Sequence, residues 1–123
     1  MDARTDKVAL GAALATLTEY WSQQTVGEAN GSLFKIAKGT GSTTWHSHDD
    51  QDEVFLLMSG SLVIQLRGRD VTLAPGELFI IPRGVEHCPR ADEEARFLIV
   101  GTSITSNTAG GKPEWSEGGG LPQ

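Results

Sequence analysis

Six short runs rich in β-branched and aromatic residues, each closed by a turn signal of glycine or proline, occupy residues 31–101. They read SLFKIAKG, EVFLLMSG, SLVIQLRG, DVTLAPG, ELFIIPRG and ARFLIVG, and they recur roughly every 8 to 15 residues. Runs of this length and spacing indicate strands joined by tight turns. Alternating βα units would need helical stretches between the runs, so the pattern predicts an all-β sandwich or barrel.

The segments on either side of these runs have a different character. Residues 5–21 predict a short amphipathic helix, capped by Thr5 or Asp6 and weakened by Gly11. The apolar face of this helix is formed by Leu10, Leu14, Leu17 and Trp21. Residues 102–123 are rich in Gly, Ser, Thr and Pro and predict an irregular tail. We therefore expect a helix and lead-in over residues 1–30, one barrel domain over residues 31–101, and a tail over residues 102–123.

Composition excludes several classes of protein. The net charge is -6 and the only basic cluster is RGR at residues 67–69, which argues against binding to nucleic acid. No apolar stretch approaches the roughly 20 residues that a membrane span needs, and no signal-peptide pattern opens the sequence. Cys88 is the only cysteine, which excludes an intramolecular disulfide and favours a reducing compartment. We expect a soluble cytoplasmic protein.

The histidines are few and lie in a pattern typical of a metal site. His46 and His48 point to the same face if their segment is extended, and a reverse turn through DDQD can return Glu53 to them. His87, the remaining histidine, follows a β-rich run and a tight turn. Neutral imidazoles with one carboxylate suit one divalent transition metal ion such as Fe, Mn, Ni, Co or Zn, whereas Mg and Ca prefer oxygen ligands.

These residues resemble the two sequence motifs of the cupins. The first motif, G-x5-H-x-H-x3,4-E-x6-G, is matched by His46, His48, Glu53 and Gly60. The second motif, G-x5-P-x-G-x2-H-x3-N, is matched by Gly76, Pro82, Gly84 and His87. Two positions depart from the motifs, because Gly39 and Gly41 flank the place of the leading glycine and Ala91 replaces the closing asparagine. Neither departure removes a ligand.

The resemblance implies a double-stranded β-helix, the jelly-roll barrel of cupins, preceded by a short N-terminal helix. It also implies that one divalent ion binds inside the barrel through His46, His48, Glu53 and His87. A barrel of this size would leave open edge strands, so we expect a homodimer. A narrower similarity over roughly residues 20–108 is to small single-domain cupins labelled mannose-6-phosphate isomerase-like, a label that carries no reaction with it.

Three classes of function fit such a site. The first, which we favour, is a metalloenzyme that acts on a small O,O-chelating organic anion, and the resemblance implies dioxygenase, isomerase or lyase chemistry without ranking them. The second is a non-catalytic module that binds a sugar or another small molecule as a sensor. The third is a structural or storage role in which the ion only braces the barrel. An anion is favoured as the ligand because a divalent ion and Glu53 leave a local charge of about +1.

For several other residues, a structural role is the simplest interpretation. Asp49, Asp50 and Asp52 are typical of a solvated turn, with Asp52 as the alternative metal carboxylate. On a strand, Cys88 should point away from the metal as a packed thiol. A rim arginine can anchor an anion. The other assignments are an orientation away from the ligands for Trp45, core positions for Phe34, Phe55, Phe79 and Phe97, a barrel plug or dimer contact for Tyr20 and Trp21, and rim positions for Arg67, Arg83 and Arg90.

Overall fold

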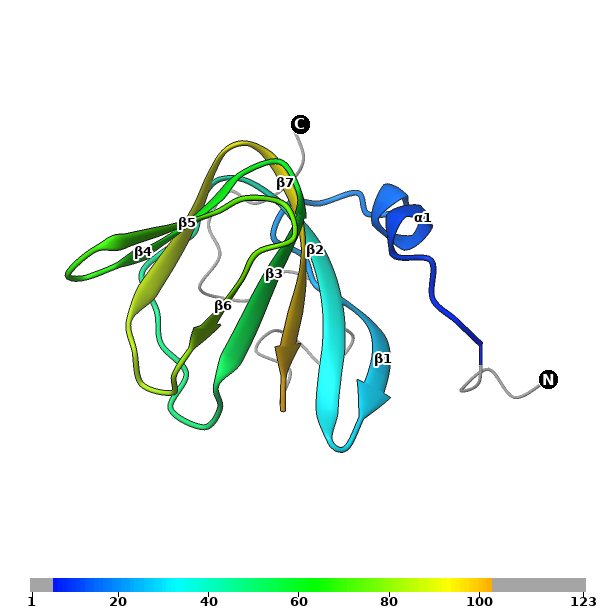
Figure 1. Cartoon of the computed structure of the whole chain (residues 1–123), viewed down its shortest axis with the longest axis horizontal. Coiled ribbons are helices and arrows are strands. Elements are labelled where there is room, and N and C mark those ends of the chain that lie inside the picture. Colours follow the sequence, from blue (N-terminus) through cyan, green and yellow to red (C-terminus); the bar gives the residue numbers. More distant parts are fainter. Residues whose placement is uncertain (1–5, 103–123) are drawn as a thin grey trace.

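The computed structural model describes residues 6–102, which form an antiparallel β-barrel with one short helix (Figure 1). The elements are α1 (Leu10–Ala15), β1 (Gln24–Ala29), β2 (Ser32–Ser42), β3 (Glu53–Ser59), β4 (Leu62–Leu66), β5 (Asp70–Leu73), β6 (Leu78–Ile81) and β7 (His87–Gly101). The double-stranded β-helix expected from the sequence is confirmed. Of the expected tail, residues 103–123 lie outside the described part of the chain. No helix between residues 6 and 102 is long and apolar enough to cross a membrane.

The long strand β7 joins the two sides of the barrel. Its C-terminal half lies between β2 and β3, in the strand order β1-β2-β7-β3-β6. Its N-terminal half pairs with β4, which forms a hairpin with β5. Figure 1 shows this hairpin folded away from the sheet that contains β2 and β3. Residues at the two ends of β7 therefore contribute to different parts of one interior.

Aromatic and aliphatic side chains fill that interior. The rings of Phe55 on β3 and Phe97 on β7 stack with their centroids 5.7 Å apart, and both side chains are buried. The indole of Trp21 lies 5.8 Å from the Phe97 ring and donates a hydrogen bond from Nε1 to the Thr40 carbonyl over 3.0 Å. It also lies against Gly39, where an added Cβ would be 2.5 Å from the ring. Trp21 therefore belongs to the barrel core, and so does its neighbour Tyr20.

The expected helix and barrel boundaries need correction. The helix ends at Ala15, so Trp21 lies outside it and instead has a left-handed backbone with a φ of 64°. Strand β1 falls inside the segment expected to be a lead-in, and it pairs with β2, so the sheet begins before residue 31. β1 was missed because it is an edge strand whose residues are mostly exposed and show no apolar alternation.

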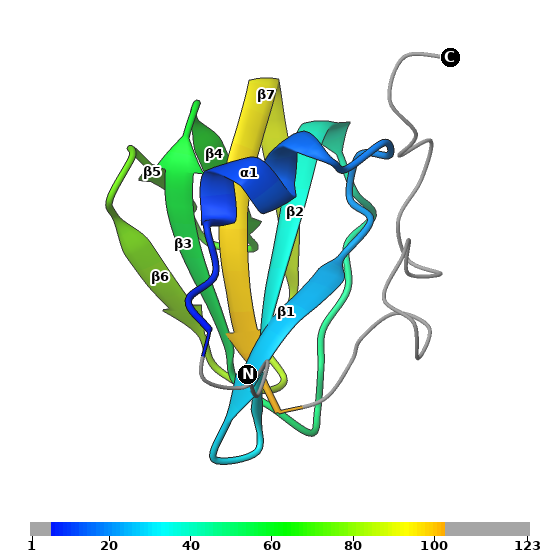
Figure 2. The same ribbon diagram turned by 90° about the vertical axis from the view of Figure 1, so that its right-hand side faces the viewer.

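One outer face of the sheet is apolar across four strands. The pairing of β2, β7, β3 and β6 aligns two rows of side chains on this face. The first row is Phe34, Val100, Val54 and Ile80, and the second is Ile36, Leu98, Leu56 and Leu78. Leu78 and Ile80 are 56% and 52% exposed, and α1 approaches the β2 end of the sheet (Figure 2). Phe34 therefore belongs to an outer face and not to the core, whereas Phe79 packs partly buried against the core.

Candidate metal centre

The backbone fixes two of the histidine segments against each other. His46 lies between β2 and β3, and its N–H donates to the His87 carbonyl over 3.0 Å while the His87 N–H donates back over 2.9 Å. The Gly84 N–H donates to the His48 carbonyl over 2.8 Å, in a turn where the φ of Gly84 is 79°. Only a residue that tolerates positive φ fits such a turn readily. Residues far apart in the sequence are thus held in register by main-chain bonds.

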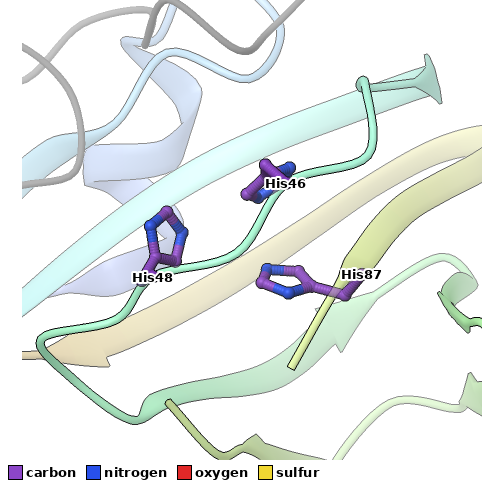
Figure 3. A group of neighbouring side chains, drawn as sticks. All are labelled: His46, His48 and His87. Carbon is purple, nitrogen blue, oxygen red and sulfur yellow. The ribbon is translucent and has the colours of Figure 1, made fainter. Parts of the chain in front are cut away.

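The three imidazole rings converge from these segments. Figure 3 shows His46 and His48 on the connection between β2 and β3, facing His87 at the start of β7. The ring centroids are 4.3 Å apart for His46 and His87, 5.1 Å for His46 and His48, and 5.6 Å for His48 and His87. One nitrogen from each ring lies within 4.8 Å of the other two, so this triad can hold a metal ion.

Hydrogen bonds select which nitrogen of two rings is available. The Nδ1 atom of His46 is 2.7 Å from the Thr44 carbonyl oxygen, and Nδ1 of His87 is 2.9 Å from the Val85 carbonyl oxygen. A carbonyl only accepts, so each Nδ1 carries the proton and each Nε2 keeps its lone pair. A second hydrogen bond of this kind commonly orients a histidine that binds a metal through its other nitrogen.

Glu53 lies beside the imidazoles as the first residue of β3. It is 2% exposed, and its Oε1 is 3.6 Å from Nε2 of His87 and 3.7 Å from Nε2 of His48. Burial raises the pKa of this carboxyl, but His87, His48 and Lys35 outweigh burial and hold the pKa below its ordinary value. Glu53 is therefore an anion at neutral pH. All four residues expected to bind the metal lie together at one end of the barrel interior.

Two histidines of the site, His46 and His48, are held in their neutral form. Burial, reinforced by His87, lowers the pKa of His46 to about 4. Burial also lowers the pKa of His48, although Glu53 opposes the change. Neutral imidazole is the form that coordinates metals, so these shifts keep the rings competent to bind at neutral pH.

The acidic turn before β3 does not join the imidazoles. Asp49 and Asp50 are exposed, as expected for a solvated turn. Asp52 is also exposed, and its Oδ1 accepts a hydrogen bond from the Arg83 N–H over 2.9 Å. The Arg83 side chain lies 3.7 Å from the same oxygen. Asp52 therefore supports the turn that precedes β7, and Glu53 is the carboxylate beside the rings.

Residues next to the histidines face away from the site. Cys88 is buried on the other side of β7 from His87, and its Sγ donates to the Thr43 carbonyl over 3.0 Å. It is the packed thiol expected from the sequence. Trp45 is 36% exposed, and the guanidinium carbon of Arg67 lies 3.8 Å from the centroid of its ring. Arg67 is thus held at the surface by Trp45 and, through an ion pair of 3.3 Å, by Glu86.

Two buried polar residues near the site were missed by sequence reasoning. Lys35 on β2 is 0% exposed, and Gln51 on the loop before β3 is 2% exposed. Burial lowers the pKa of Lys35, and Glu53 partly opposes this effect. Side chains alternate along a strand, and the residues on either side of Lys35, Phe34 and Ile36, are apolar. This pattern places Lys35 on the solvent face, so the sequence of the strand does not indicate that Lys35 is buried.

Comparison with known proteins agrees with this fold. The Cupin_2 family, described as "Cupin domain", matches residues 32–101. A solved cupin-2 domain protein from Shewanella frigidimarina is 39% identical with a TM-score of 0.74, covering 76% of this chain and 91% of that one. Protein NMB1881 from Neisseria meningitidis is 25% identical with a TM-score of 0.73, covering 80% of this chain and 100% of that one.

A curated relative from Bacillus subtilis, the uncharacterised protein YdbB, is 31% identical over 67 residues. The alignment covers 54% of this chain and 59% of YdbB. The chain thus matches less than two thirds of the length of that relative.

Proposed function

Because the chain belongs to the cupin family, we propose that it is a metalloprotein with an enzymatic role at the imidazole triad. The barrel binds one divalent ion such as Fe, Mn, Ni, Co or Zn through four side chains: His46, His48, Glu53 and His87. One observation carries this proposal. A nitrogen from each of three imidazoles lies within 4.8 Å of the other two, next to a buried ionised carboxylate.

The unsatisfied polar atoms of the site support a metal as its occupant. Nε2 of His87 and Oε2 of Glu53 are buried and make no hydrogen bond within residues 6–102. A buried polar atom without a partner costs about 1–3 kcal/mol, and native proteins tolerate few of them. A single divalent ion bound by both atoms would satisfy them at once.

The chain determines what kind of molecule fits the centre. A bound ion supplies Lewis-acid chemistry at ligand oxygens, and redox chemistry in addition if the metal is iron. Glu53 cancels part of the charge of the ion while the imidazoles add none, which leaves about one positive charge in an apolar interior. The buried rings of Phe55 and Phe97 belong to the apolar core of the same barrel. These features favour a small anion that offers two oxygens, which is the ligand class of a dioxygenase, isomerase or lyase acting on an enolate, a keto acid or a hydroxy acid.

Calorimetry on metal-loaded and metal-free protein tests this function. The probes are the conjugate base of a diketone, an α-keto acid and a neutral alcohol of matched size. We expect the two anions to bind the metal-loaded protein far more tightly than the metal-free protein, and more tightly than the alcohol. Equal affinities across both forms and all three probes would refute chelation at the metal and favour a non-catalytic binding module.

The apolar outer face supports a homodimer. Two adjacent rows of apolar side chains cross four strands there, and Leu78 and Ile80 are more than half exposed. A contiguous apolar surface of this kind typically marks a protein interface. We infer that a second copy of the chain packs its own outer face on this one, because the same face on both partners closes a symmetric contact.

A further inference from the structure

A small cavity lies inside the barrel next to the candidate metal centre. It has room for one water-sized group, with a volume of about 10 Å³ open to the centre of that group. Its wall includes Phe55, which follows Glu53 by two positions on the inner face of β3. The wall also includes Pro89, which follows His87 by two positions on β7. The cavity therefore occupies the next layer of the barrel interior, about 7 Å along the strands from two of the proposed ligands.

Gln23 is the one polar residue among the described residues that line this cavity. It is 3% exposed, and its Oε1 is buried and makes no hydrogen bond within residues 6–102. A buried carbonyl oxygen without a partner is costly, and native proteins contain few of them. Gln23 thus presents an unsatisfied acceptor in an otherwise apolar wall. The apolar residues of that wall are Trp21, Ala37, Phe55, Pro89, Phe97 and Ile99.

The register of the sheet explains why Gln23 faces inward. Gln24, the first residue of β1, pairs with Ile36 on β2, so Gln23 stands beside Ala37. Ala37 is in turn paired with Phe97 on β7, and both are core residues. Gln23 therefore begins a row of side chains on the inner face, whereas the adjacent Gln24 is exposed.

A hydroxyl group suits this cavity better than other polar groups. None of the described residues that line it is charged, so a carboxylate or an ammonium would be buried there without a partner of opposite charge. The side-chain amide of Gln23 can present its carbonyl or, after rotation, its NH₂ group, and a hydroxyl can donate to the first or accept from the second. The apolar remainder of the wall suits the carbon chain that carries the hydroxyl.

We propose that Gln23 binds a hydroxyl group at the end of the ligand remote from the metal, so that the site prefers hydroxyl-ended chains over alkyl chains. This inference rests on the proposed metal function and narrows its ligand class to O,O-chelating anions that carry a distal neutral hydroxyl. The chelating end lies at the imidazole triad, and the hydroxyl donates to Oε1 of Gln23. The distance of about 7 Å between the two layers corresponds to roughly six bonds of an extended chain. Gln23 is a specificity-determining residue and takes no part in the chemistry at the metal.

Two pairs of α-hydroxy acids test this assignment. In each pair, one acid ends in a hydroxyl and the other in a methyl group of similar size. The pairs are 2,5-dihydroxypentanoate with 2-hydroxyhexanoate, and 2,6-dihydroxyhexanoate with 2-hydroxyheptanoate. Calorimetry at neutral pH on the metal-loaded wild type should show the hydroxyl-ended acid of at least one pair binding about tenfold to a hundredfold more tightly, as expected when a buried acceptor gains its partner. Gln23→Leu should abolish or reverse this preference while the metal content stays at the wild-type level, because an apolar wall favours the methyl group.

A neighbouring glutamine provides a matched control. Gln24 is the same amino acid at the next position, but it is exposed on the other face of the sheet. Gln24→Leu should leave the ratio of affinities unchanged in both pairs. Gln23→Met should behave as Gln23→Leu does, and it replaces that variant if the leucine protein does not fold. Because Oε1 of Gln23 has no partner, we also expect Gln23→Leu to keep or raise the Tm of the ligand-free protein.

The outcomes separate the two proposals. Equal affinities of the wild type within both pairs, or an unchanged ratio in the Gln23→Leu protein, would overturn the role of Gln23 and leave the metal function standing. Gln23 would then hold no more than a buried water. Loss of the metal in Gln23→Leu but not in Gln24→Leu would also overturn it, because Gln23 would then act on the metal centre itself. If the metal-loaded wild type binds none of the four acids, the proposed ligand class and this inference both fail.

Discussion

Replacing His87 by alanine tests the metal centre through the stability of the whole barrel. His87 is 1% exposed and starts β7, while the other proposed ligands lie on the segment after β2 and at the start of β3. An ion that binds only the native state stabilises it by about 2.7 kcal/mol when its free concentration is a hundred times its dissociation constant. For a domain of this size that gain raises Tm by roughly 10 °C. The His87→Ala protein should show little or no rise at the same metal concentration.

Thermal unfolding followed by circular dichroism, with and without added metal, measures this difference. Cys88→Ala is the matched control, because Cys88 is the next residue of β7 and is also buried but faces away from the rings. That variant should lose stability from the cavity it creates and still gain the full increment from the metal. An equal metal-dependent rise in the wild type and in His87→Ala would refute coordination by His87.

Three other changes have defined outcomes. Acidifying the metal-free protein from about pH 6.5 to about pH 4 should lower its free energy of unfolding in urea titrations, because burial depresses the pKa of His46 and the unfolded chain takes up the proton first. Gly39→Ala should cost about 1–3 kcal/mol in the same assay because its methyl would meet the Trp21 ring, whereas Gly11→Ala in α1 should stabilise by about 0.5–1 kcal/mol. Ile80→Glu should convert a dimer to a monomer in light scattering with an unchanged far-ultraviolet spectrum, and a monomeric wild type would refute the dimer.

The nearness of the four candidate ligands could be predicted because it depends on their spacing in the sequence. His46 and His48 share one face of an extended segment, a short acidic turn returns Glu53, and a glycine turn precedes His87. Each of these relations is local to a few residues. The distance between the two motifs in space follows from the fold. The six apolar runs with regular turn signals predicted an all-β sandwich or barrel, and the resemblance to cupins narrowed this to the double-stranded β-helix.

Other features depend on long-range packing and were not predictable. Strand β1 is held by its pairing with β2 and has little apolar surface of its own. Trp21 has a spacing that fits a helix, but the contact of its ring with Gly39 places it in the core. From their polarity, Lys35 would be expected on the outer face of the sheet and Phe34 on the inner face, and the structure shows the reverse. The reason is that the outer face of this sheet is apolar and the inner face contains the candidate metal centre.

The position of β7 in the chain has a consequence for the order of folding events. β7 is the last strand described, and it pairs with β2, β3 and β4, which all precede it. These contacts close long loops, so they form slowly and late. His87 reaches the other candidate ligands only when β7 pairs with the earlier strands, so we expect an ion to meet the full set of proposed ligands only after this late step. Metal should therefore slow unfolding and leave the refolding rate almost unchanged. The ion would then stabilise the folded barrel without stabilising the transition state for its folding.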